Sequence, residues 1–166
     1  MSKNNLTQIE LKQLLSYDPE TGVFLRLTHH PRFPIGSIAG SKKKRGHITI
    51  RIGYDMYKAH RLAWLYVYGE WPKDQIDHID CDPGNNRIRN LREADNSQNH
   101  ANCKRQPNNT SGHKGVRLDK RRGKWHVSLK HKGKERFLGY YDKFDVACSA
   151  YAQAAHDTFG QYARIE

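Results

Sequence analysis

The spacing of apolar residues predicts short helices and strands over the first 75 residues. Helical spacing predicts helices at 7–15, capped by Thr7, and at 60–68, ended by Gly69 and Pro72. Between them, alternating or compact apolar runs predict strands at 23–27, 35–39, 47–52 and 56–59, with a turn at 18–22. This part of the chain therefore reads as mixed helix and sheet.

From Gln75 the pattern becomes more polar. Residues 75–80 predict a strand and residues 81–89 predict a polar loop. Ile88, Leu91 and Ala94 are expected to anchor the second strand, in which the chain returns from this loop. Asp95 or Asn96 then caps a helix that runs to residue 103. The expected order is strand, loop, strand, helix within about 30 residues.

The last third predicts a small sheet packed on one helix. Residues 104–111 read as a polar linker, followed by strands at 114–118, 125–131 and 136–140 and a helix at 143–159. Trp125, Val127 and Leu129 alternate with His126, Ser128 and Lys130, so the first set is expected to meet the alanine-rich face of the helix. Three strands and one helix make a minimal two-layer unit.

Composition narrows the classes of partner. The chain has 166 residues and a formal net charge of +12, with a mean hydropathy of −0.94. Such a positive chain favours a polyanion, nucleic acid first. No apolar run approaches the ~20 residues of a membrane span, and no stretch of signal-peptide type opens the sequence. Three widely spaced cysteines offer neither a disulfide framework nor a CxxC zinc site, which favours a reducing cytoplasm.

The charge is unevenly distributed. Residues 1–75 and 111–166 each carry 12 basic and 6 acidic side chains, whereas 76–110 carry 5 of each. Ten cations fall within 114–136 alone. Acidic and amide oxygens between two basic regions suit a hard cation working on a nucleic acid. The plain alternative is a solvated surface with one acidic loop.

Asp77, His78, Asn90 and Asn99 are the candidate catalytic residues. Phosphodiester hydrolysis needs a base to deprotonate water, which an imidazole supplies, and a cation to neutralise the leaving oxygen. In a regular strand Asp77 and His78 point to opposite faces, so both serve one site only if the strand ends or twists there. The alternative is that the Asp and Asn residues of 77–90 only build turns.

The same residues carry a family resemblance. Residues 76–80 (IDHID), 85–92 (NNRIRNLR) and 97–102 (SQNHAN) resemble the HNH nucleases of the phage and homing-endonuclease branch, with Asn90 12 residues after His78 and Asn99 9 residues after Asn90. Residues 57–64 (YKAHRLAW) and 69–72 (GEWP) resemble the segment that precedes this motif in phage-type members. The resemblance covers roughly residues 10–105.

The HNH resemblance implies a ββα-metal fold and a role for each residue. His78 is expected to activate water, Asp77 and Asn99 to ligate one divalent cation, Mg²⁺ or Mn²⁺, and Asn90 to brace the loop. Asn99 stands where a second histidine is frequent, which favours those ions over zinc. The role of His60 has two interpretations, a packed histidine or a contact with a phosphate or the site. The tip at Lys42–Arg45 also has two, a solvated turn or a segment that binds the nucleic-acid backbone.

The last third shows a second resemblance. Residues 112–117 (GHKGVR), 123–125 (GKW), 138–142 (LGYYD) and the alanine-rich helix resemble the DNA-binding domain of plant ethylene-response factors, over roughly 111–163. Asp119 and Glu135 replace arginines of the plant pattern, and Phe137 and Arg121 replace tryptophans, so the plant target is not carried over. A cationic sheet face of this kind suits the major groove; the alternative is a face charged for solubility. The candidate DNA-binding residues are Lys114, Arg117, Arg121, Arg122, Lys124, His126, Ser128, Lys130, Arg136 and Phe137.

Together these patterns predict an α+β protein: an N-terminal HNH domain at 1–103 with its ββα-metal core at 75–103, a linker at 104–111, and a C-terminal domain at 112–166 with a three-stranded antiparallel sheet packed on one helix. The expected function is a metal-dependent endonuclease, monomeric, acting on double-stranded DNA with no membrane or small-molecule partner. The expected setting is the cytoplasm of a bacterial host, with a phage or other mobile element as source. The alternatives are a catalytically silent, sequence-specific DNA-binding regulator and an RNA-directed nuclease.

Overall fold

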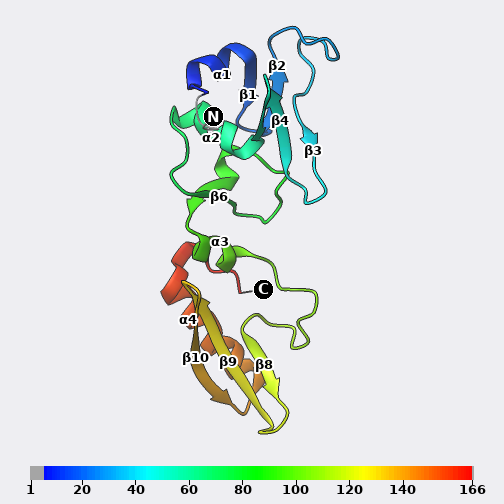
Figure 1. Ribbon diagram of the computed structural model, residues 1–166. Helices are drawn as coiled ribbons and strands as arrows, with labels where there is room; N and C mark the ends of the chain where they lie inside the picture. Colours follow the sequence, from blue (N-terminus) through cyan, green and yellow to red (C-terminus); the bar gives the residue numbers. More distant parts are fainter. Residues whose placement is uncertain (1–5, 166) are drawn as a thin grey trace. The chain divides into compact units, whose positions relative to one another are not determined.

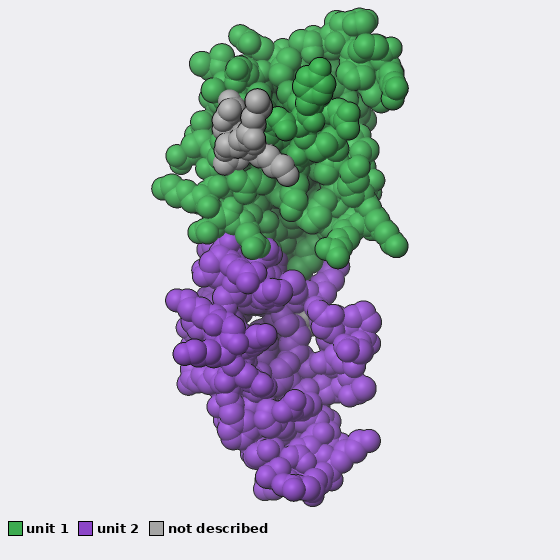
Figure 2. All heavy atoms as spheres, viewed as in Figure 1, with its two compact units in different colours: residues 1–93 green, residues 94–166 purple. Residues whose placement is uncertain are grey.

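A computed structural model of the protein describes residues 6–165 (Figure 1), so residues 1–5 and 166 of the predicted terminal domains lie outside the described residues. By its contacts the chain divides into unit 1, residues 1–93, and unit 2, residues 94–166 (Figure 2). The predicted linker at 104–111 falls inside unit 2. The predicted α+β class agrees with what is seen, small antiparallel sheets among helices.

The described residues of unit 1 form two helices, three small sheets and one 3₁₀ turn. Its elements are α1 (Gln8–Leu14), β1 (Leu15–Asp18), β2 (Val23–Arg26), β3 (Ser41–Lys42), β4 (Ile48–Ile52), β5 (Asp55–Lys58), α2 (Ala59–Tyr68), β6 (Gln75–His78), η1 (Ile88–Asn90) and β7 (Leu91–Ala94), the last of which ends one residue into unit 2. The sheets are β1–β2, β3–β4–β5 and β6–β7. Buried Leu11, Phe24, Ile50 and Leu62 sit at the centre of its core.

Two local predictions in unit 1 are wrong. The first helix ends at Leu14, and Leu15–Asp18 forms a strand paired with β2, because extended backbone there buries Leu15 and Tyr17 on one side. The strand expected at 35–39 is reduced to an isolated bridge between Ile38 and Leu25. Pro34 and Gly36 break that segment, and Gly36 adopts a positive φ of 82°.

The turn at 18–22 braces a later loop. Arg87 Nε donates to Glu20 O at 2.6 Å, and Ile88 N donates to Pro19 O at 3.3 Å. A Cβ on Gly22 would lie 2.5 Å from Arg87 N, so only glycine allows this approach. The N-terminal hairpin therefore supports the backbone at 86–88.

Unit 2 combines the helix α3 with the C-terminal sheet and helix. Its further elements are α3 (Asn96–Asn102), β8 (Val116–Asp119), β9 (Lys124–His131), β10 (Lys134–Tyr141), α4 (Phe144–Phe159) and η2 (Gly160–Tyr162). The antiparallel sheet has the order β10–β9–β8. Val127 and Leu129 pack with Ala147 and Ala155 of α4, which confirms the expected inward face. In the part of the chain described, no helix is long and apolar enough to cross a membrane.

Candidate functional site

Asp77 and His78 are the last two residues of β6. Both are buried, with 4% and 6% of their surface exposed. The strand ends at His78, and the chain turns through Cys81, which adopts a positive φ of 60°. The strand therefore ends directly at these two residues, which is the condition under which both side chains could serve one site.

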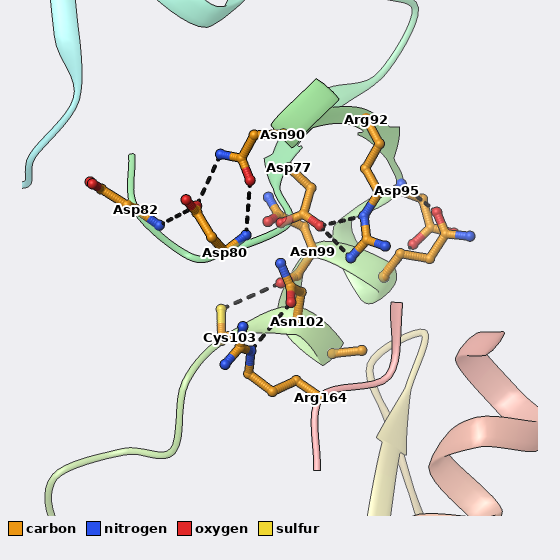
Figure 3. A network of polar contacts seen from close by, with 12 residues as sticks. Asp77, Asp80, Asp82, Asn90, Arg92, Asp95, Asn99, Asn102, Cys103 and Arg164 are labelled. Atoms are coloured by element: carbon orange, nitrogen blue, oxygen red, sulfur yellow. Dashed lines mark hydrogen bonds and ion pairs between the residues drawn. The ribbon is translucent and has the colours of Figure 1, made fainter. Parts of the chain in front are cut away.

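Arg92 on β7 fixes the carboxylate of Asp77. Its Nε and Nη2 lie 2.9 and 2.8 Å from Asp77 Oδ2 (Figure 3). The Arg92 side chain is itself only 14% exposed, so this ion pair is well screened from water. Such a partly buried, charge-assisted pair sets the direction of the carboxylate.

A chain of hydrogen bonds orients His78. Asn86 Nδ2 donates to Gly84 O, which directs Oδ1 of this amide toward His78 Nε2 at 3.4 Å. Because Oδ1 only accepts, Nε2 carries the proton and Nδ1 the lone pair; this tautomer is assigned from the network. The buried hydroxyl of Tyr17 donates to Asn86 O at 2.7 Å. The N-terminal hairpin thus reaches the histidine through Asn86.

Three imidazoles pack together in unit 1. The ring centroids of His60 and His78 lie 5.0 Å apart, those of His47 and His60 5.3 Å, and those of His47 and His78 5.9 Å. Burial lowers the pKa of His60 to about 2. Burial also lowers the pKa of His47 and of His78, for which the Asn86 hydrogen bond and nearby carboxylates act in the opposite direction. At neutral pH His60 is uncharged, in keeping with the packed alternative left open for this residue.

Asn90 ties the polar loop together. Its Nδ2 donates to Asp80 Oδ1 at 3.0 Å, and its Oδ1 accepts from Asp80 N at 3.1 Å (Figure 3). The same Nδ2 donates to Asn85 O at 2.9 Å. Asp80 also accepts hydrogen bonds from Asp82 N at 2.8 Å and Asn85 Nδ2 at 2.6 Å. Burial raises the pKa of Asp80, but the hydrogen bonds from Asp82, Asn85 and Asn90 together outweigh it and lower the pKa. The bonds of Asn90 and Asp80 are those of side chains that hold a loop.

Asn99 belongs to α3 and so to unit 2, whereas Asp77 and His78 belong to unit 1. Helix α3 begins with a capping box between Asp95 and Gln98. One carboxylate and one amide oxygen are ligands of the kind that Mg²⁺ and Mn²⁺ accept. Among residues 6–165 no group of three or more His, Cys, Asp or Glu side chains has the geometry of a metal site.

Most candidate DNA-binding residues lie on the sheet face opposite α4. Directly paired residues share a face, and the pairs Arg117–His126, Ser128–Phe137 and Lys130–Glu135 all lie on the outer one. Phe137 is 53% exposed, and its ring contacts His126 and Tyr140. Arg122 lies over the Tyr140 ring and pairs with Asp119, Lys124 pairs with Asp142, and Arg121 is exposed in the same turn as Arg122. The outer face therefore combines cations with exposed aromatic rings.

Two candidates lie elsewhere. Arg136 is paired with Leu129, which faces α4, so Arg136 does not share the outer face with Arg117. Lys114 donates through Nζ to Ala101 O and Cys103 O, at the end of α3. Arg136 and Phe137 are neighbours on β10, so alternation already excludes a shared face for them, whereas Lys114 precedes β8 and lies outside the alternation.

Further cations line a cleft within unit 2. The cleft has a volume of about 1030 Å³, and its walls include His100 of α3, the segment 103–106 and the β9–β10 turn. Lys104, Arg105 and Lys132 contribute positive charge to it.

In unit 1 the tip at Lys42–Arg45 is exposed. A Cβ on the adjoining Gly46 would lie 2.7 Å from Pro83, so the base of this turn contacts the polar loop.

Sequence reasoning missed several residues that build the site. From the sequence Asn86 is only a loop residue, and nothing singles out His47, Arg92 or Tyr17 for a role. Each contacts Asp77, His78 or Asn86 from 8 to 69 positions away. The one available signal was the concentration of polar side chains at 77–92, which contains Asn86 and Arg92.

The comparisons with known proteins match the segment of the chain that contains these residues. A family model described as HNH endonuclease matches residues 57–101, which places the HNH domain mid-chain rather than at the N-terminus as predicted. Protein 3.8 of Escherichia phage T7 is 34% identical over 113 residues, which cover 68% of this chain and 93% of that protein. No solved structure matches the chain. The matched segment contains Asp77, His78, Asn90 and Asn99, and the chain belongs to the family of phage T7 Protein 3.8 and carries an HNH endonuclease domain at residues 57–101.

Proposed function

We propose that this protein is a metal-dependent DNA endonuclease that hydrolyses phosphodiester bonds in a phage-infected bacterial cell. The HNH domain supports a nuclease role. The observation that carries the proposal is the buried His78, oriented by Asn86 and adjacent to Asp77, which Arg92 fixes. An oriented base beside a fixed carboxylate suits phosphodiester hydrolysis, which needs a group to deprotonate water and a ligand for a cation.

In this reaction His78 is the general base. Asn86 Oδ1 lies 3.4 Å from Nε2 and orients the ring, and the unprotonated ring nitrogen of His78 takes the proton from the attacking water. The water oxygen forms a bond to phosphorus as the bond between phosphorus and the leaving oxygen breaks. Because burial lowers the pKa of His78, the unprotonated base predominates at neutral pH.

Asp77 and Asn99 are the proposed holders of one divalent cation, Mg²⁺ or Mn²⁺. When bound, such a cation neutralises the charge that develops on the leaving oxygen. Arg92 keeps the Asp77 carboxylate in one direction, and Asn90 keeps the loop between His78 and β7 in one shape. These side chains thereby reduce the reorganisation that catalysis would otherwise need.

The C-terminal sheet is the proposed targeting surface, an ethylene-response-factor-like domain that binds duplex DNA. The support is its outer face, on which Arg117 and Lys130 lie with the exposed ring of Phe137. Cations contact phosphates and exposed side chains contact base edges when such a face enters a groove. The protein is proposed to act as a monomer.

Cleavage of supercoiled plasmid DNA tests the proposal. Wild-type protein in millimolar Mg²⁺ or Mn²⁺ is expected to give nicked or linear product, EDTA to abolish it, and His78→Ala to lose about 10²-fold or more of the rate. His29→Ala, an exposed histidine of unit 1, is the matched control and is expected to cleave like the wild type.

The alternatives give different results in the same assay. DNA binding without cleavage in both metals, with His78→Ala indistinguishable from wild type, would favour a catalytically silent DNA-binding regulator. Structured RNA that competes better than duplex DNA, and is itself cut, would favour an RNA-directed nuclease. A competition series with both nucleic acids at one salt concentration separates these outcomes.

A further inference from the structure

We infer that the C-terminal domain is part of the catalytic apparatus and not only a targeting module, because it holds α3, the helix that carries Asn99. Lys114 is the principal positioning residue in this arrangement. The inference rests on the proposed function, in which Asn99 ligates the cation. It assigns Lys114 a role different from the DNA contact expected from its place in the sequence.

Lys114 caps the C-terminal end of α3. Its ammonium nitrogen lies 2.7 Å from Ala101 O and 2.8 Å from Cys103 O. The last carbonyls of a helix have no partner within the helix, and the end carries partial negative charge. Lys114, a half-buried residue, donates to two of these carbonyls and brings a positive charge to this end of the helix. Two of its three donor hydrogens are therefore committed to α3.

Further contacts hold α3 from the same domain. Lys132 N, in the β9–β10 turn, donates to Ser97 Oγ at 2.9 Å. Arg164, beyond α4, donates from N to Ala101 O and from Nε to Asn102 Oδ1, each at 3.4 Å (Figure 3). Ala101 packs against the hydrophobic core of the C-terminal domain. The helix is thus tied near both ends and along one side.

These contacts matter because α3 is short. It has 7 residues, whereas isolated helices shorter than ~12–15 residues are marginal in water. The capping box at Asp95 stabilises only its first turn. Asn99 lies between Ser97 and Ala101, so the position of its side chain depends on anchors that the C-terminal domain supplies. A helix left to itself would present Asn99 in many orientations.

The decisive variant is Lys114→Met, which keeps the length of the side chain and removes the ammonium. We expect kcat at saturating DNA to fall about tenfold or more, since small misplacements of a catalytic group cost up to ~10²-fold. The Kd for DNA, measured in EDTA, is expected to stay within about twofold. Hydrogen exchange of the amides of 97–103 is expected to speed up. Lys120→Met, in the exposed β8–β9 turn, is the matched control and is expected to change none of these.

Opposite results identify the phosphate-contact role. If Lys114→Met weakens DNA binding and reduces the salt slope by about one while kcat at saturation and exchange in α3 stay unchanged, Lys114 contacts the nucleic acid and the inference is wrong. Lys130→Met, on the outer sheet face, provides the reference pattern for a binding residue. Should Lys114→Met not fold, Ser97→Ala removes another anchor and is expected to lower kcat and raise exchange in the same direction.

Failure of this inference is distinguishable from failure of the proposed function. If wild-type protein cuts nothing in Mg²⁺ or Mn²⁺, the nuclease proposal fails, whereas the exchange measurement still decides whether Lys114 holds α3. If wild-type protein cuts and Lys114→Met cuts equally well at saturating DNA, the nuclease proposal stands and the positioning role of Lys114 is rejected.

Discussion

At the scale of single residues, the three packed imidazoles of unit 1 make the free energy of unfolding depend on pH. His60 is 4% exposed, and neither its Nδ1 nor that of His47 finds a hydrogen-bond partner among the described residues. A buried nitrogen without a partner costs roughly 1–3 kcal/mol. A proton on His60 would add a buried charge to this cost, so the packed ring stays neutral in the folded chain.

The stability of the protein is expected to fall as the pH drops below about 6.5. The folded chain keeps His60 neutral down to pH about 2, while the unfolded chain binds a proton below the ordinary value of 6.5. The unfolded state then holds more protons, so the free energy of unfolding decreases with falling pH, by about 2 kcal/mol from His60 alone at pH 5.0. His47 and His78 act in the same direction because their pKa values are also lowered.

Urea unfolding at pH 7.5 and pH 5.0 measures this effect. His60→Phe, which removes the titrating group, is expected to lose less stability between the two pH values than the wild type. His29→Gln, at an exposed histidine, is expected to keep the wild-type difference. Equal pH dependence in His60→Phe and wild type would show that His60 is not held neutral by burial.

At the scale of elements, periodicity predicted the strongly amphipathic pieces well. α2, α4 and β9 lie within one residue of their predicted bounds, because their apolar residues face a core on one side. β1 was missed because Leu15 continues the helical spacing of α1, and only pairing with β2 makes it extended. The hydrogen bonds of α3 with Lys114, Lys132 and Arg164 could not be predicted, because they join residues 13 to 62 positions apart.

At the candidate site, the sequence allowed a choice of candidate residues but not of the side chains that support them. Asp77, His78, Asn90 and Asn99 could be selected as candidates because their residue types and spacing suit the proposed chemistry, and the family match covers all four positions. Their partners could not, because Tyr17 meets Asn86 from a distant hairpin and His47 enters from a separate sheet. Sequence spacing thus selects candidate reactive groups, whereas tertiary packing selects the side chains that orient them.

Gly115 is expected to be essential to the shape of unit 2. It has a φ of +67°, and an added Cβ would lie 2.0 Å from Tyr151 Cε2 and 2.6 Å from Ser128 O. Gly112 has a φ of +84° but nothing within 4 Å of such a Cβ. Gly115→Ala is expected to cost about 2–4 kcal/mol, from backbone strain and overpacking together, and Gly112→Ala about 1 kcal/mol from strain alone.

Urea denaturation, followed by the fluorescence of Trp125 in unit 2, would measure the free energy of unfolding of both variants. Similar losses for the two glycines would mean that Tyr151 and Ser128 give way and that the close approach is not required. Because Gly115 follows Lys114, its replacement is also expected to loosen α3, seen as faster amide exchange in 97–103.

At the scale of the whole molecule, positive charge is shared by both units. Residues 1–93 carry 15 basic and 10 acidic side chains, and residues 94–166 carry 14 and 7. The shorter unit therefore has the higher density of net charge. Its outer sheet face presents Arg117 and Lys130, whereas Arg136 shares the face of Leu129.

Binding of duplex DNA is accordingly expected to weaken steeply with salt, since each neutralised phosphate releases counterions. Arg117→Met combined with Lys130→Met is expected to reduce the slope of log K against log salt by about two. Arg136→Met, which removes a cation of the same domain from the other face, is expected to change it by less than about one-half. Fluorescence anisotropy with a labelled duplex over a salt series, in EDTA, supplies the slopes. Equal slopes for all three proteins would mean that the outer face does not contact phosphates, and binding would then have to come from the cations of the cleft or of unit 1.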